Sequence, residues 1–240
     1  MRIKRQFIAV RLLIGFGLVV EVGVLTPALA MDAKAVDDQI ILSGKVVDGD
    51  IARFKRALDA NPGVTTIILR NSPGGDPWSG FRIGELIRKK SLTTAVSGYC
   101  YSSCSRMYLG GTRRIFTDDY PAEFTEIGFH GHYKKDGTLD EPLMKKTGLR
   151  DWILRFLGDK ADVELVGRWV MIPTSSGMAR FFNPALVSRQ GASAFFCSGT
   201  EPRDLQPFGC EAIPKSALDI GVSTGTDIIS SKDQAELRGR

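Results

Sequence analysis

The sequence predicts an α/β fold with a mostly parallel sheet. Two β-branched, apolar runs that suit buried strands, 64–70 and 92–98, alternate with segments in which apolar residues recur at helical spacing. Each of the two runs is followed by a glycine-containing turn that opens into a helix. This strand–helix rhythm is typical of parallel strands joined by right-handed crossovers.

The first half of the chain supplies most of the expected strands. A strand is expected at 39–46, followed by a helix that begins at Asp48 or Asp50 and ends at Asn61-Pro62-Gly63. The helix at 77–90 carries one broad apolar face, and a third helix follows the strand at 92–98. Two short strands are then expected, at 113–119 and 126–133.

The second half is more helical. Helices are expected at 141–157 and 161–171, and short helices at 184–190 and 214–220. The polar residues after Gly225 are expected to be frayed.

The first 30 residues have the layout of a secretory signal peptide. A basic start leads into an apolar run, which ends in an Ala-x-Ala site at 28–30. Glu21 and Arg11 interrupt the run, so the alternative is an uncleaved membrane anchor at 7–29. No later apolar run is long enough to span a bilayer. We therefore expect an exported, periplasmic protein, or one that associates with the inner membrane through this segment.

The charge balance gives no sign of a nucleic-acid partner. The formal net charge of the chain is +5, and removal of the leader lowers it to +2, because four Lys or Arg residues leave with one Glu. A net charge this close to zero gives no indication of a polyanionic ligand.

Export makes the four cysteines candidates for disulfides. Adjacent pairing, Cys100 with Cys104 and Cys197 with Cys210, is the simplest of three connectivities. The second pair closes a loop rich in Gly and Pro, and a disulfide would stabilise this irregular segment. The first pair requires Cys100 to lie in a turn rather than on the following helix.

Two turns carry the residues that could do chemistry. The sequence NSPGG at 71–75 follows one expected strand, and GYCYSSC at 98–104 follows the next. In a parallel sheet both turns emerge at the carboxyl ends of neighbouring strands, where α/β proteins place their active sites. A serine at the start of the following helix lies near free backbone amides, which can stabilise an oxyanion.

A serine nucleophile requires a base, and the chain has only two histidines. His130 and His132 alternate with Gly131, so on a strand they would face the same side. They could equally be incidental residues of a polar strand end. A metal site is less well supported because no third ligand lies at a recognisable spacing, and we expect no metal and no cofactor.

Five segments resemble the Clp protease proteolytic subunit and the crotonase-like superfamily, in particular exported bacterial proteins of that fold. The resemblance covers roughly 40–133, and the segments are LRNSPGGD, GFRIGELIRK, VSGYCYSSC, LGGTRR and IGFH. It implies a spiral of strand-strand-helix units with a mostly parallel sheet and a helical C-terminal part. The domain would span 31–225, with a Cys-containing extension at 192–225 and a polar tail at 226–240. The resemblance also implies a homo-oligomer.

The resemblance implies catalytic roles for four residues. The family's nucleophile lies four residues after a glycine, and from Gly98 this position is Ser102. The amides of Ser103 and Gly74 would then form the oxyanion hole. His130 matches the family's base, which lies near the end of a strand.

The third member of the triad is where the sequence departs from the family. The position of the family's aspartate falls on Ala179, which has no carboxylate. Asp162 could orient His130 instead, and so could Glu164, Asp118 or Asp119.

Two functions therefore remain open. The first is an exported serine hydrolase, a peptidase acting on a peptide or protein. The second is an inactive member of the fold that serves as a binding or assembly module in the cell envelope. Lys134, Lys135 and Lys160 match no transferable Ser–Lys pattern, and export argues against an acyl-CoA substrate.

Overall fold

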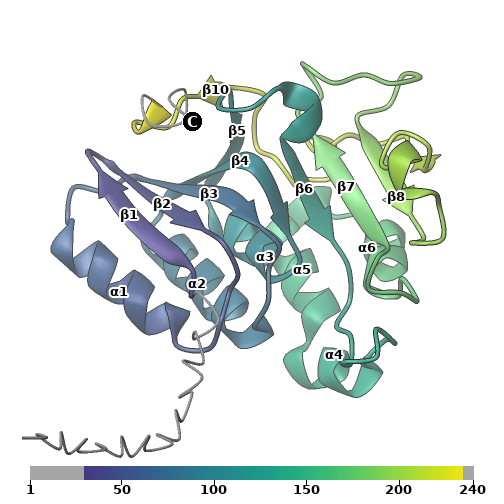
Figure 1. The fold of residues 1–240 in the computed structure, drawn as a ribbon, viewed down its shortest axis with the longest axis horizontal. Coiled ribbons are helices and arrows are strands. Elements are labelled where there is room, and N and C mark those ends of the chain that lie inside the picture. Colours follow the sequence, from purple (N-terminus) through teal and green to yellow (C-terminus); the bar gives the residue numbers. More distant parts are fainter. Residues whose placement is uncertain (1–29, 235–240) are drawn as a thin grey trace, which may run out of the picture.

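One mixed sheet organises residues 30–234, which are the residues that the structure, a computed structural model, describes (Figure 1). Its strands run in the order β1-β2-β3-β4-β6-β7-β8-β9, with β5 beside β4 and β10 beside β5. The strands are β1 Asp32–Val36, β2 Gln39–Ser43, β3 Thr66–Ser72, β4 Thr93–Tyr101, β5 Arg113–Thr117, β6 Glu126–Phe129, β7 Met178–Phe182, β8 Ala194–Cys197, β9 Glu211–Ala212 and β10 Ile228–Ile229.

The centre of the sheet is parallel and its edges are antiparallel. Strands β2, β3 and β4 pair in parallel, and β4 also pairs in parallel with β5 and β6. Antiparallel pairs add β1 at one end and β7, β8 and β9 at the other. The predicted α/β class with a mostly parallel sheet is confirmed.

Strand β4 has a different partner on each half of one edge. Its first half, Thr93–Val96, pairs with β5, and its last residues, Tyr99–Tyr101, pair with β6. The change occurs around Gly98, whose φ is +71° and which lies against the Asn71 side chain. As a result, the carboxyl ends of β3, β4 and β6 meet at one edge of the sheet.

Six α-helices accompany the sheet in the described part of the chain: α1 Asp50–Ala60, α2 Pro77–Lys89, α3 Ser103–Gly110, α4 Glu141–Thr147, α5 Leu149–Leu157 and α6 Val163–Val170. The start of α2 follows from its sequence, because the Asp76 side chain accepts a hydrogen bond from the Ser79 amide at 2.6 Å and Pro77 occupies the first position. The expected helix at 141–157 is in fact two, because Gly148 ends α4 with a φ of +60°.

Two expected short helices are absent. Residues 184–190 form turns, because the Asn183 side chain accepts a hydrogen bond from the Ala185 amide at 3.0 Å. Residues 214–220 also form turns, and there Ser216 and Asp219 bond to each other's backbone. In both segments a side-chain oxygen takes the place of a helical acceptor.

Alternation along the strands divides the core into two faces. Ile40, Leu42, Ile67 and Leu69 belong to the large cluster shared with the helices. The intervening residues form a small cluster on the other face: Ile41, Ile68, Ala95 and Ile115. This period of two is what sheet geometry requires of a strand that is buried on both faces.

Residues 226–234 are more ordered than their sequence indicates. Ile228 and Ile229 form β10, which pairs with β5. Arg70 makes a bidentate ion pair with Asp233, with both contacts at 2.8 Å. The expectation of a frayed end is therefore wrong for 226–234. The predicted leader lies outside the described residues except for Ala30. In the described part of the chain, no helix is long and apolar enough to cross a membrane.

Candidate active site

Ser102, the predicted nucleophile, lies in the turn between β4 and α3. Its backbone has a φ of +57° and a ψ of −120°, a region that residues other than glycine rarely occupy. The Ser102 amide donates to the Gly128 carbonyl at 3.1 Å, and the Ser105 hydroxyl donates to the Ser102 carbonyl at 2.6 Å. Strained backbone of this kind persists only where its surroundings fix it, and it concentrates at functional sites.

A disulfide closes the same turn. It joins Cys100, near the end of β4, to Cys104, in the first turn of α3, with the two Cα atoms 5.3 Å apart. Both cysteines are fully buried, so the bond supports the Ser102 turn from the core side. The structure also joins Cys197 to Cys210, and the simplest connectivity is thus the one observed.

Gly74 brings the two predicted turns into contact. A Cβ at this position would lie 2.5 Å from the Tyr101 carbonyl oxygen, 2.7 Å from the Ser102 Cβ and 2.9 Å from the Ser103 nitrogen. Only a residue without a side chain fits so closely, and the φ of +81° also favours glycine. The Gly74 amide makes one long hydrogen bond, of 3.4 Å, to the Ser72 hydroxyl.

Ser103 is the first residue of α3. Amides at this position have no partner within the helix, and they lie at its positive end. Gly74 and Ser103, the two predicted oxyanion donors, therefore lie side by side next to Ser102.

His130, the predicted base, directly follows β6 and lies two residues beyond Gly128. Its Nδ1 atom is buried and has no hydrogen-bond partner among the described residues. Burial lowers the pKa of His130 to about 4, the positive charge of Arg106 contributes in the same direction, and the Gly177 backbone opposes both. The ring is therefore neutral at neutral pH, which is the form that a general base requires.

His132 is part of the packing instead. It is 6% exposed, its Nε2 atom lies 3.1 Å from the Thr147 hydroxyl, and its ring meets the Phe81 ring edge-on at 6.2 Å. Burial, followed by the charges of Arg106 and His130, lowers the pKa of His132 to about 3. The H-x-H pattern thus contains one histidine at the edge of the sheet and one packed against α2.

The position of the missing acid is adjacent to His130. Ala179 lies in β7 and pairs directly with Phe129, so a carboxylate there would be close to the base. Asp162 begins α6, where it accepts a hydrogen bond from the Leu165 amide at 2.9 Å and pairs with Lys215 at 2.7 Å. Its role as orienting acid stays a prediction that these contacts do not favour.

Asp118 and Asp119, two of the other candidate acids, also have different partners. Asp119 accepts from the Ser97 hydroxyl at 2.6 Å and pairs with Arg70, and Asp118 accepts from Ser230 at 2.8 Å. Within residues 30–234, no carboxylate bonds to His130, and no group of three or more His, Cys, Asp or Glu residues could hold a metal ion.

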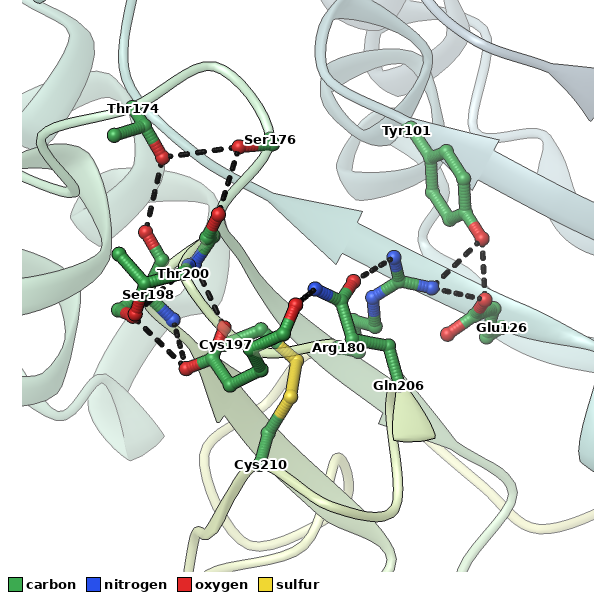
Figure 2. The surroundings of a disulfide bond; sticks show 12 residues. Tyr101, Glu126, Thr174, Ser176, Arg180, Cys197, Ser198, Thr200, Gln206 and Cys210 are labelled. Carbon is green, nitrogen blue, oxygen red and sulfur yellow. Dashed lines mark hydrogen bonds and ion pairs between the residues drawn. A yellow bond between two sulfur atoms is a disulfide. The ribbon is translucent and has the colours of Figure 1, made fainter. Parts of the chain in front are cut away.

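A polar cluster that was not predicted from the sequence lies beside the Ser102 turn. The Tyr101 hydroxyl donates to the Glu126 carboxylate, and Arg180 bonds to both, at 3.2 Å to Tyr101 and 2.8 Å to Glu126 (Figure 2). Arg180 also donates to Gln206 at 3.4 Å. The cluster therefore links the turn to the extension closed by the second disulfide. The sequence carries no local signal for it, because Tyr101, Glu126 and Arg180 come from three different strands, β4, β6 and β7.

Two surface hollows lie elsewhere. One of about 450 Å³ is lined mainly by α4, α5 and α6, and another of about 490 Å³ lies beside Arg180 and Gln206. Neither Ser102 nor His130 lines them.

No protein-family model matches the sequence, and no curated protein matches it. Solved structures do match it. ClpP1 from Listeria monocytogenes is 14% identical with a TM-score of 0.49, and the match covers 82% of this chain and 94% of that chain. A single-residue variant of the same protein matches over the same shares at 14% identity, with a TM-score of 0.47. This is a likeness in fold at low identity.

Proposed function

We propose that the chain is an exported serine hydrolase that cleaves a peptide or protein substrate. Ser102 is the nucleophile, His130 is the general base, and the amides of Ser103 and Gly74 receive the oxyanion. The observation that carries this proposal is the left-handed backbone of Ser102, held at the end of β4 by a hydrogen bond to Gly128, two residues before His130.

The chemistry follows from these positions. The Ser102 oxygen attacks the substrate carbonyl carbon while its proton passes to His130, and the negative charge that develops on the carbonyl oxygen is stabilised by the two amides. His130 then gives the proton to the leaving amine as the carbon–nitrogen bond breaks. Water, activated by His130, hydrolyses the resulting ester and restores the serine.

No carboxylate among residues 30–234 bonds to His130, and this limits the reaction. The acid of a triad fixes the imidazole and stabilises its protonated form, and its loss lowers turnover by orders of magnitude. A His130 with a pKa of about 4 is also a weak base. We therefore infer a slow Ser–His dyad, in which the fixed turn supplies much of the catalytic advantage.

A fluorophosphonate probe, which labels activated serines, tests the proposal on the full chain produced with its own leader. The unmodified protein should be labelled, whereas Ser102→Ala and His130→Ala should not. Ser103→Ala is the matched control, because it keeps the backbone amide and removes a hydroxyl that is fully buried and has no partner among the described residues.

Labelling that survives Ser102→Ala but is lost in Ser103→Ala would contradict the assignment. An unlabelled wild-type protein would leave the binding or assembly module as the function. Export and a homo-oligomer are parts of the proposal that N-terminal sequencing and native mass spectrometry of the same preparation can check. Two disulfides are consistent with export.

A further inference from the structure

Arg106 is a buried cation without a counterion. The residue is 2% exposed, its Nε atom is buried without a hydrogen-bond partner, and no ion pair joins it to a described carboxylate. Two other buried arginines differ from it. Arg70 pairs with Asp119 and Asp233, and Arg114 donates to three backbone carbonyls. The structure therefore satisfies those two arginines and leaves Arg106 with free donors.

Arg106 lies beside the candidate catalytic residues. It is on α3, one helical turn after Ser102, and its guanidinium carbon lies 5.0 Å from the centre of the Phe81 ring. The same phenyl ring packs against His132. The positive charge of Arg106 lowers the pKa of both His130 and His132, which puts the guanidinium within electrostatic reach of the two rings.

Within residues 30–234, no carboxylate forms an ion pair with this charge. The acid that acts on it most strongly is Asp76, and that side chain already caps α2 by accepting the Ser79 amide at 2.6 Å. Burial lowers the pKa of Arg106 to about 9, so the group still carries its charge at neutral pH. An unpaired buried charge is costly, and it is seldom retained unless a ligand or a mechanism uses it.

The chemistry of the unpaired group identifies the ligand class. A guanidinium is a planar fork of donors that matches a carboxylate with two parallel hydrogen bonds. Phe81 supports one face of the plane, as aromatic rings commonly do for arginine. Because water is largely excluded there, a charged acceptor would bind more tightly than a neutral amide of the same shape.

We propose that Arg106 is a binding residue for a carboxylate of the substrate, next to Ser102 and His130. The inference rests on the proposed function only in taking these two residues as the catalytic centre. The carboxylate comes either from an acidic side chain near the cleaved bond or from the C-terminus of the peptide. The chain therefore selects acidic peptides over their amide counterparts.

Fluorescence anisotropy with Ser102→Ala protein tests the selection, because this background needs no catalysis. Two pairs of labelled peptides are compared. One pair has Glu or Gln at a single internal position with both ends blocked, and the other has an uncharged sequence that ends in a free or an amidated carboxyl group. We expect the dissociation constant of the acidic member to be at least tenfold lower in one of the two pairs. The pair that shows this difference identifies the source of the carboxylate.

Variants then assign the preference to Arg106. Arg106→Gln should abolish it, and Arg106→Lys should keep part of it. Arg82→Gln removes an exposed charge from neighbouring α2 and should leave the preference unchanged. Circular dichroism establishes that each variant is folded.

Equal binding of the two members in both pairs would overturn the inference, and this comparison needs no Arg106 variant. A preference that survives Arg106→Gln would also overturn it. Failure of the hydrolase proposal would appear separately, as an unlabelled wild-type protein.

Discussion

The amide of Ser102 donates a hydrogen bond of 3.1 Å to the carbonyl of Gly128. This bond extends the β4–β6 ladder by one residue, past the pair of Tyr101 with Gly128. Because His130 follows Gly128 by two residues, the bond sets the register between the proposed nucleophile and its base. The geometry of the site therefore depends on how the two neighbouring turns hold the end of β4.

Gly74→Ala should abolish probe labelling of Ser102. The new methyl group would lie 2.5 Å from the Tyr101 carbonyl oxygen and 2.7 Å from the Ser102 Cβ, so one of the two turns must move. The proposed oxyanion donors would move with it, and the loss of one donor typically lowers the rate 10²–10³-fold. The labelling rate constant measures the effect. Gly63→Ala, which meets no atom within 4 Å, should label at the normal rate.

The two disulfides should affect different properties. Loop entropy predicts a loss of about 2 kcal/mol in unfolding free energy for Cys100→Ala with Cys104→Ala, and about 3 kcal/mol for Cys197→Ala with Cys210→Ala. Only the first pair closes the Ser102 turn, so only its removal should slow labelling by tenfold or more. Urea denaturation and labelling of the same two variants measure both properties. Equal labelling rates in both would show that the disulfide is not needed to hold the turn.

The labelling rate should be flat at mildly acidic pH. His130 acts as a base only in its neutral form, and burial together with the Arg106 charge keeps its pKa near 4. A group with this pKa is neutral above pH 5, so the rate should fall only as the pH approaches 4. The rate constant measured between pH 4 and pH 8 checks this, and a midpoint near 6.5 would show that His130 is not buried as described.

The strands of the first half could be predicted because each carries its own signal. The runs predicted at 64–70 and 92–98 correspond to β3 Thr66–Ser72 and β4 Thr93–Tyr101, since β-branched and apolar residues suit a sheet that is buried on both faces. The turns after these strands could also be predicted, because a glycine is needed where Gly74 lies so close to Ser102.

Residues whose roles depend on distant partners could not be predicted in this way. Arg106 has the sequence character of a solvated side chain, and only the packing of α3 against α2 buries it. His132 follows His130 in an alternating pattern, yet it packs against Phe81 because β6 ends at Phe129 and the chain turns away from strand geometry. Both depend on tertiary contacts that have no local signature.

The order of the C-terminal residues should depend on one buried ion pair. Asp233 lies 163 positions from Arg70 in sequence. The polar composition of the C-terminal residues therefore gave no indication of this contact. Both side chains are less than 10% exposed. Asp233→Ala leaves the buried guanidinium with Asp119, at 3.3 Å, as its one charged partner among the described residues, and should cost about 3 kcal/mol of unfolding free energy. The control is Asp227→Ala, which breaks an exposed pair with Arg113 and should cost less than about 1 kcal/mol. Urea denaturation compares them, and equal losses would mean that the Arg70–Asp233 pair does not anchor the end of the chain.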